Sequence, residues 1–414
     1  MPVVHHRCRR TEQKAEELTN ARSKNRQMGP NTLLAHGPYD PHSLHGFVNP
    51  PVIHASTVLF ESTDAMRHRK SLPYTYGLRG TPTTKALEDA LSELEGADET
   101  ILVPSGLAAI TVPLLAFLGA GDHCLVVDSV YTPTRQFCNG TLRRMGVEIA
   151  YFDPHIGAGI ADLMKPNTKV VFLEAPGSNT FEMMDVAAVC AAARAGGAVT
   201  MLDNTWATPL YFRPIAHGVD LSIHALTKYP GGHSDLMMGS VSATAATAAQ
   251  LRETQMQIGL NAAPDDVYLV LRGLKTMGVR LERHQASALE LARWLERRED
   301  VAEVRHPALP SFFDHALYAR QFSGCSGLFS FLLPGGFKQA ATFLDALELI
   351  GLGYSWGGHE SLAVAVDLSD RTVAKGPKDG TFIRLQVGLE DVADLKADLE
   401  AGFAALAATA GTAG

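Results

Sequence analysis

The chain has 414 residues, of which 46% are hydrophobic and 19% charged, and its formal net charge at pH 7 is −8. This composition is ordinary for a globular protein, and the acidic balance argues against a nucleic-acid-binding surface over the whole molecule. The five cysteines are scattered and form no CxxC pair, so neither a disulfide framework nor a metal site is expected. Reduced thiols favour a cytoplasmic location.

Two segments near the N-terminus could be mistaken for targeting or membrane-spanning sequences. Residues 1–30 are polar and basic and contain no apolar core of a signal peptide. They predict an arm that is either solvated or ordered against a neighbouring subunit. Residues 101–121 carry no charge, but Pro104 and Pro113 interrupt them. A buried strand, a turn and a buried helix explain this stretch better than a membrane span does.

From about residue 100, short β-rich segments alternate with longer helical segments. Strands are expected over 99–103, 123–127, 147–152, 169–174, 198–203 and 221–225, and helices over 107–118, 134–145 and 185–195. Near-continuous apolar strands separated by helices indicate an α/β fold, with a mostly parallel sheet covered by helices on both faces. In such sheets, ligands bind at the carboxyl ends of the strands.

The character of the sequence changes after about residue 265. Helical periodicity runs through 268–300, strand-like pieces follow at 301–306 and 327–333, and a helix is expected over 341–350. A strand at 382–388 and a helix over 391–408 complete the pattern. We therefore expect three parts. They are an N-terminal extension (1–75) that contacts a neighbouring subunit, an α/β domain (76–274) and a smaller α+β domain (275–414).

Three strand ends carry residues suited to one chemistry. After the first strand, Ser105 and Gly106 open a helix whose N–H groups and dipole suit a phosphate, although such turns are common. Asp203 ends a buried strand, where a carboxylate either caps a turn or faces a cationic ligand atom. Lys228 follows the next strand, beside Thr227. It is either half of an ion pair or a desolvated, nucleophilic amine.

Together these three strand ends describe a site for pyridoxal phosphate. The lysine would bind the cofactor covalently, the acid would hold the ring nitrogen protonated, and the helix start would hold the phosphate. No GxGxxG follows a strand and no GxxxxGK[ST] is present. Sites for dinucleotides and nucleoside triphosphates therefore lack support.

Several long motifs point to one family. They include YGLRGTPTTKALEDALSELEG (76–96), VPSGLAA (103–109), ALTKYPGGHSDLMMGS (225–240) and YSWGGHESL (354–362). With these motifs, the chain from about residue 31 to residue 408 resembles the Cys/Met-metabolism family of pyridoxal-phosphate-dependent enzymes. The resemblance implies fold type I, with an aspartate-aminotransferase-like large domain, and pyridoxal 5′-phosphate as the cofactor.

The resemblance also implies how the cofactor is held. The implied roles are covalent attachment and catalysis for Lys228, pairing with the ring nitrogen for Asp203, phosphate binding for Gly106, Leu107 and Thr227, and ring stacking and catalysis for Tyr131. Tyr76 would reach the phosphate bound by the neighbouring subunit. Many relatives carry an arginine two residues after this tyrosine; here Leu78 occupies that position and Arg79 follows. Many also have a serine three residues before the lysine, where this chain has Ala225.

The resemblance further implies residues that bind the substrate. Arg384 would clamp the α-carboxylate of a sulfur amino acid with two hydrogen bonds. Ser355, Trp356 and Tyr354 would line the pocket. Relatives that act at Cγ often show a glutamate where this chain has Tyr354, so the pattern YSWGG favours cleavage of a carbon–sulfur bond at Cβ. The implied reaction is β-elimination of cystathionine to homocysteine, pyruvate and ammonia, a step of methionine biosynthesis.

Other activities stay open on the sequence alone. They are the γ-lyase, γ-synthase and sulfhydrylase reactions of the same family, an aminotransferase on the same fold, and a non-catalytic regulator that senses a ligand. The family also implies a homotetramer built from two dimers. No nucleic-acid or membrane partner is expected.

Overall fold

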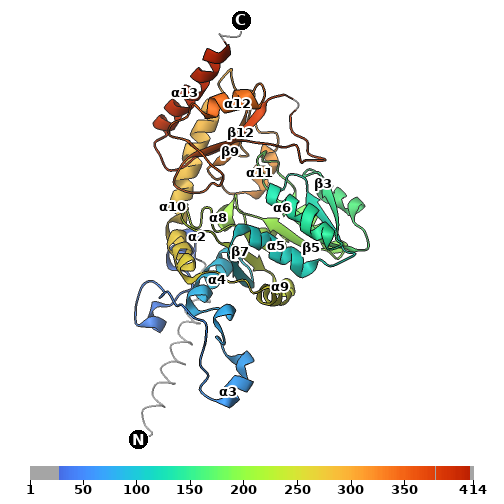
Figure 1. The fold of residues 1–414 in the computed structure, drawn as a ribbon, viewed down its shortest axis with the longest axis vertical. Coiled ribbons are helices and arrows are strands. Elements are labelled where there is room, and N and C mark those ends of the chain that lie inside the picture. Colours follow the sequence, from blue (N-terminus) through green and yellow to red (C-terminus); the bar gives the residue numbers. More distant parts are fainter. Residues whose placement is uncertain (1–27, 378, 411–414) are drawn as a thin grey trace.

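The computed structural model of the chain describes residues 28–377 and 379–410. Its larger part is built on a seven-stranded sheet in the order β1-β7-β6-β5-β4-β2-β3 (Figure 1). The strands are β1 (Glu99–Val103), β2 (His123–Val127), β3 (Glu148–Phe152), β4 (Thr168–Glu174), β5 (Val199–Asp203), β6 (Leu221–His224) and β7 (Gly239–Ala243). All but β7 lie where the sequence predicts strands. The neighbours from β3 through β2, β4 and β5 to β6 are parallel.

The sequence does not predict β7, which pairs antiparallel with both β1 and β6. Its residues read GSVSA, with a single β-branched side chain, and this composition is poor for a strand. Small residues are required here because the start of helix α5 (Gly106–Phe117) packs closely. A Cβ atom on Gly239 would lie 2.4 Å from the carbonyl oxygen of Ser105.

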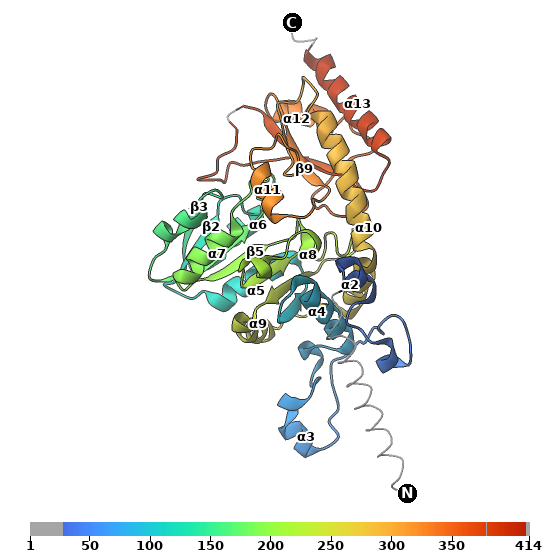
Figure 2. The ribbon, with the colours of Figure 1, turned by 180° about the vertical axis from the view of Figure 1, so that it is seen from behind.

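Helices cover both faces of the large sheet. Helices α5 and α6 (Thr132–Phe137) lie in front of it in Figure 1, and α7 (Val186–Ala195) lies in front of it in Figure 2. The remaining helices of this part are α2 (Pro30–His36), α4 (Pro82–Glu95), α8 (Thr208–Tyr211) and α9 (Ala245–Ile258). Every residue of β2 is buried, as expected for a strand covered on both sides. The predicted fold class is confirmed. The helix predicted over 134–145 is divided, since a π-helical turn follows α6 at Cys138–Leu142.

A second sheet of five strands forms the small domain, in the order β10-β11-β12-β9-β8. Its elements are β8 (Glu303–Arg305), α11 (His315–Gln321), β9 (Leu328–Leu333), α12 (Phe337–Leu344), β10 (Gly351–Leu352), β11 (Leu362–Ala365), β12 (Thr381–Gln386) and α13 (Val392–Ala410). The helix predicted over 341–350 is misplaced, because α12 ends at Leu344. Beyond it, the N–H groups of Glu348 and Ile350 donate to the carboxylate of Asp398 on α13, both at 2.8 Å.

The long helix α10 (Pro264–Leu295) connects the two sheets (Figure 1). Its first half packs against α2 and α4, and its second half packs against β9 and α13. The boundary expected after residue 274 falls inside this helix. The division into residues 76–274 and 275–414 therefore stays a prediction.

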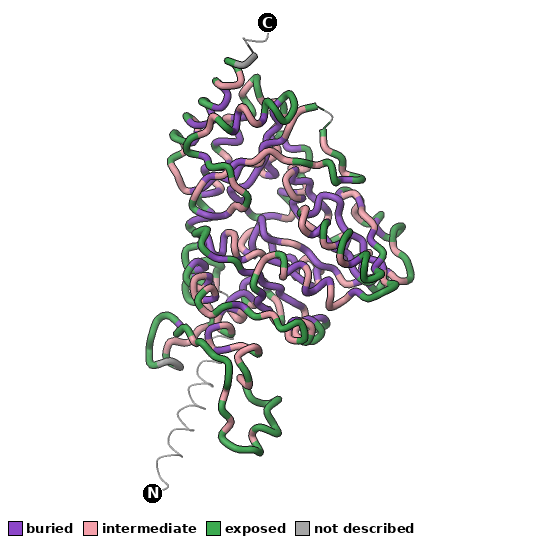
Figure 3. The backbone as a smooth tube through the Cα atoms, viewed as in Figure 1, coloured by how far each residue is buried: buried purple, intermediate pink, exposed green. Residues whose placement is uncertain are grey.

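Part of the N-terminal extension projects away from both domains, with α3 (Thr63–Arg67) near its tip (Figure 1), whereas α2 packs against α10 and α4. Figure 3 shows this projection as mostly exposed, and it includes apolar side chains such as Leu59, which is 89% exposed. Clustered apolar exposure favours contact with another chain, and that contact stays a prediction. Residues 1–27 of the expected arm lie outside the described residues. Among the helices that the structure describes, none combines the length and apolar character needed to cross a bilayer.

Candidate active site

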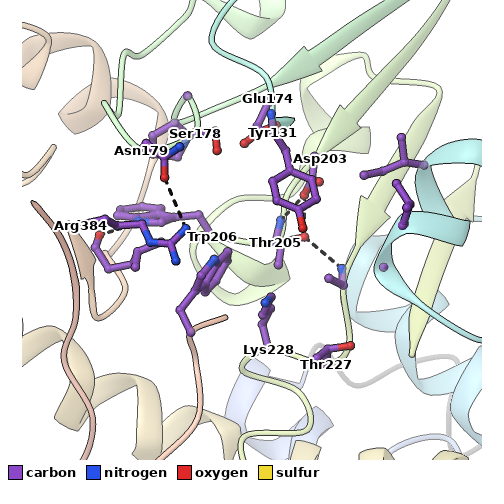
Figure 4. Close-up of a pocket in the computed structure, with 18 of the residues that line it drawn as sticks. Tyr131, Glu174, Ser178, Asn179, Asp203, Thr205, Trp206, Thr227, Lys228 and Arg384 are labelled. Carbon is purple, nitrogen blue, oxygen red and sulfur yellow. Dashed lines mark hydrogen bonds between the residues drawn. The ribbon is translucent and has the colours of Figure 1, made fainter. Parts of the chain in front are cut away.

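A cavity of about 250 Å³ opens at the carboxyl ends of the parallel strands and has walls from both domains. Figure 4 shows ten of its lining residues by name. The sequence-predicted residues that line it are Gly106, Leu107, Tyr131, Asp203, Thr227, Lys228, Trp356 and Arg384. The structure therefore brings the three predicted strand ends together at one place, as the parallel topology requires.

The start of α5 forms one wall of the cavity. The Ser105 hydroxyl caps the helix by accepting the N–H of Ala108 at 3.1 Å. The first N–H groups of a helix have no acceptor within it, so those at Gly106 and Leu107 can bind an anion. A Cβ atom on Gly106 would lie 2.6 Å from the Cβ of Ala225. This position therefore requires glycine, because the methyl group of Ala225 lies too close for any side chain.

Asp203 lies at the end of β5 and is fixed by Thr205, two residues further on. The Thr205 N–H and hydroxyl both donate to Asp203 Oδ1, at 3.0 and 2.5 Å. Thr205 Oγ1 in turn accepts the N–H of Ala225 at 3.0 Å, which connects the ends of β5 and β6. Burial raises the pKa of Asp203 even though these bonds oppose the shift. A cationic ring nitrogen beside this carboxylate would favour its charged form.

Lys228 follows β6 after a short turn, and its side chain points into the cavity (Figure 4). Its Nζ donates to Ser355 Oγ at 2.7 Å and lies 5.2 Å from the ring centre of Trp356. Burial, and then the charge of Arg384, lower the pKa of Lys228 to about 8, against the opposing effect of Asp203. A substantial fraction of the amine is therefore neutral and nucleophilic near pH 8.

Arg384 on β12 forms the opposite wall of the cavity, and burial lowers its pKa. Its Nη1 donates to Asn179 Oδ1 at 3.3 Å, and its Nη2 donates to the Ser355 carbonyl at 3.5 Å. Ser355 has a φ of +90°, an unusual backbone conformation for a residue with a side chain. Ser355 therefore contacts both residues: its carbonyl accepts from Arg384, and its hydroxyl accepts from Lys228.

Tyr131 and Glu174 are joined by a hydrogen bond, and the sequence analysis predicted only Tyr131 as a site residue. The Tyr131 N–H donates to Glu174 Oε2 at 2.8 Å, and Glu174 is in register with Asp203 on neighbouring parallel strands. Burial, and then the Asp203 charge, raise the pKa of Glu174 well above its usual value. Glu174 and Asn179 were missed by the sequence analysis. Glu174 carries the same signal as Asp203, since it ends a buried strand.

The remaining predicted residues do not line this cavity. Tyr76 is 51% exposed and forms an isolated bridge with Thr57 on the projecting extension. Arg79 lines a different hollow, together with Lys70 and other residues. Tyr354 is 88% exposed beside Ser355. The structure does not bring Tyr76, Arg79 and Tyr354 into this cavity, and their roles stay predictions, as do the roles of the residues that line it.

The residues of the cavity fit pyridoxal 5′-phosphate (PLP). Gly106, Asp203 and Lys228 line one cavity, which places the N–H groups at the start of α5, a buried carboxylate and an amine around the same space. Gly106, Leu107 and Thr227 would hold the phosphate, Asp203 would hold the ring nitrogen, and Lys228 would hold the aldehyde carbon.

This architecture, with an anion-binding helix start, a buried acid and a desolvated lysine on one sheet edge, is that of a fold type I PLP enzyme. The family described as Cys/Met metabolism PLP-dependent enzyme matches residues 31–404, and the chain belongs to this family. Its cofactor is PLP. The resemblance expected from the motifs, the fold class and the cofactor are confirmed.

Individual relatives span nearly the whole chain. A protein of Rhizobium johnstonii is 61% identical over 385 residues, which are 92% of this chain and 97% of that protein. Cystathionine beta-lyase MetC of Escherichia coli is 44% identical over 372 residues, 87% of this chain and 94% of that one. The solved structure of cystathionine gamma synthase from Xanthomonas oryzae pv. oryzae has a TM-score of 0.86 and 32% identity, and covers 93% of this chain and 100% of its own.

Proposed function

We propose that this enzyme cleaves cystathionine by β-elimination and that, with the uptake of one water molecule, the products are homocysteine, pyruvate and ammonia. The observation that carries the proposal is the position of the Lys228 amine, which shares one cavity with Asp203 and Arg384. An amino acid whose carboxylate binds Arg384 would have its Cα beside a base of lowered pKa. The identity to a cystathionine beta-lyase over most of the chain supports the choice of substrate.

Different residues of the cavity have different roles in the proposed reaction. PLP, when bound, supplies the sink for the electron pair released at Cα. Arg384 binds and orients the α-carboxylate through its planar guanidinium. The neutral amine of Lys228 takes the Cα proton, and Asp203 keeps the ring nitrogen charged.

Tyr131 is suited to deliver a proton to the departing sulfur. Burial, together with the charges of Asp203 and Glu174, raises its pKa, so the phenol stays protonated near neutral pH. The Tyr131 N–H is fixed by Glu174, which holds the residue at the cavity wall. Lys228, after accepting the Cα proton, is the alternative donor.

The alternative of γ-cleavage or γ-synthesis has support from the gamma synthase neighbour at 32% identity. Two features favour the β-reaction. The beta-lyase relative is more similar, at 44% identity, and Tyr354 supplies no carboxylate to the cavity mouth. We further propose a cytoplasmic homotetramer that acts in methionine biosynthesis, with Tyr76 and Arg79 completing the site of a neighbouring subunit.

Product analysis tests the proposal directly. The purified holoenzyme with L-cystathionine should release pyruvate and homocysteine in equal amounts. Release of 2-oxobutyrate and cysteine would mean γ-cleavage, and absence of turnover would favour a regulator.

The Lys228→Ala variant provides the residue-level test. Turnover should fall by at least the roughly 10²–10⁴-fold that general acid–base catalysis supplies. Borohydride reduction should attach the cofactor to Lys228 in the unmodified protein. As a matched control, Lys165→Ala alters an exposed lysine paired with Glu148 and should leave turnover and labelling unchanged.

A further inference from the structure

The loop between β4 and α7 (residues 177–185, the docking loop) lies against the small domain. The hydroxyl of Ser330 on β9 donates to the Asn179 carbonyl at 2.7 Å. The carboxylate of Asp314 accepts the Met183 N–H at 2.9 Å. The conformation of this large-domain loop therefore depends on contacts from the small domain.

The segment between β11 and β12 provides a further attachment. Its residues 370–374 (the strap) place three consecutive N–H groups on the fully buried carboxylate of Asp128, at the end of β2. The distances to Asp128 are 3.0 Å from Thr372, 2.7 Å from Val373 and 2.6 Å from Ala374. So many bonds to one buried carboxylate fix the strap on the large domain.

Arg371 extends from the strap to the docking loop. Its side chain is only 4% exposed. Its Nη2 donates to the Ser178 carbonyl at 2.6 Å, and its Nη1 donates to Glu182 Oε1 at 3.2 Å. One guanidinium thus binds both ends of the tight turn that contains Asn179.

Asn179 follows Ser178 and has a φ of +66°, in the left-handed region that few residues other than glycine occupy. Its side-chain oxygen accepts from Arg384 Nη1 at 3.3 Å, as Figure 4 shows. Fixing the Ser178 carbonyl fixes the peptide that leads into Asn179. The Arg371 bond, together with the Ser330 bond to the Asn179 carbonyl, therefore helps to fix where the Asn179 amide lies against Arg384.

We propose that Arg371 is a positioning residue for substrate-carboxylate binding, acting through Ser178 and Asn179 on Arg384. The inference rests on the proposed role of Arg384 in binding the α-carboxylate. Without Arg371, the Ser178 carbonyl and the Glu182 carboxylate lose a buried partner, and the turn can leave its unusual conformation. The residues that hold the cofactor come from other strand ends, so the cofactor should remain bound.

The affinity of the holoenzyme for L-alanine tests this inference, because L-alanine has an α-carboxylate but no sulfur leaving group. In an equilibrium titration followed by the absorbance of the bound cofactor, Arg371→Gln should raise the Kd for L-alanine about 10-fold, the effect of losing one charge-assisted bond. The Kd for PLP should stay within about twofold. Arg371→Lys retains the charge but offers a single nitrogen in place of the guanidinium fork, and it should raise the Kd for L-alanine about threefold.

Arg305→Gln is the matched control. Arg305 also contacts Glu182 Oε1, at 3.5 Å, but its other hydrogen-bond partner is Glu303, which lies outside the docking loop. This variant should leave the Kd for L-alanine unchanged. It therefore separates loss of a charge near Glu182 from loss of the bond to Ser178.

Three outcomes with the variants would overturn the inference. They are an unchanged Kd for L-alanine in Arg371→Gln, an equal loss of L-alanine and PLP affinity, and the same loss in Arg305→Gln. If Arg371→Gln fails to fold, Arg371→Lys decides by the same criteria. Failure of the unmodified protein to bind L-alanine would also refute it. L-alanine binding does not require cystathionine cleavage, so a wrong substrate assignment would be recognised separately in the product analysis.

Discussion

The lowered pKa of Lys228 allows us to predict how the rate of covalent PLP attachment to the cofactor-free protein depends on pH. Burial is the main cause of the shift from 10.5 to about 8, the charge of Arg384 adds to it, and Asp203 opposes it. Only the neutral amine can attack the aldehyde carbon of PLP. The rate of covalent attachment should therefore follow the titration of this one side chain.

The expected magnitude is large. At pH 7, an amine with a pKa of about 8 is roughly 10% neutral, whereas one with a pKa of 10.5 is roughly 0.03% neutral. Attachment at pH 7 should thus be roughly 300-fold faster than an unperturbed lysine would allow. The same shift corresponds to about 3 kcal/mol between the two protonation states.

Stopped-flow absorbance provides the assay, with apoprotein mixed with PLP between pH 6 and 10. A model lysine compound measured in parallel corrects for the titration of PLP itself. The corrected rate should rise with pH to a midpoint near 8. Arg384→Gln should move the midpoint upward and Asp203→Asn should move it downward. A midpoint near 10.5, or no response to either substitution, would refute this electrostatic account of the site.

Two further predictions concern Gly106 at the cavity wall and the buried Glu95 on α4. Gly106→Ala should lower the free energy of unfolding by about 1–3 kcal/mol and speed PLP dissociation, because its Cβ would meet Ala225 at 2.6 Å. Gly140→Ala, with no atom within 4 Å of its Cβ, is the control and should be near neutral in urea unfolding. Burial raises the pKa of Glu95 from 4.5 to about 8, so its stabilising effect is complete below pH 4.5 and is lost as pH rises through 8. Between pH 6 and 8.5 the unmodified protein should lose about 2–3 kcal/mol relative to Glu95→Gln in urea unfolding, and equal pH dependence in both would contradict this.

The core of the site could be predicted because its residues follow strands that the sequence marks clearly. The strands before Gly106, Asp203 and Lys228 are short apolar segments, and parallel pairing of β5 with β6 brings the ends before Asp203 and Lys228 to one edge. The end of β1 joins them through β7, which pairs antiparallel with both β1 and β6. The parallel step needs no tertiary information, whereas the place of β1 depends on a strand that the sequence does not predict. Glu174 could have been found by the same rule, because it ends β4 in register with Asp203.

Other parts could not be predicted, for a different physical reason. Asn179 reaches the cavity because Ser330 and Arg371, which lie 151 and 193 positions from their partners in the chain, hold its turn. Such contacts leave no local pattern. Strand β7 was missed because close packing of α5 requires small residues there, and this requirement overrides strand propensity. Tyr76 and Arg79 lie outside this cavity, just before α4, and the contacts expected of them would come from a second chain.

The large domain and the small domain supply different halves of the site, so contacts between the domains can affect ligand binding. The large domain provides the residues suited to PLP, whereas the small domain provides Arg384, Ser355 and Trp356 around the space for the substrate. The Lys228–Ser355 bond crosses between the two halves, so the amine of Lys228 is held by the half that we propose to bind the substrate. An amino acid that binds Arg384 therefore acts on the same small-domain residues that restrain Lys228. Changes at the domain contact should accordingly alter substrate affinity before they alter cofactor affinity, which is the separation that the Arg371 variants measure.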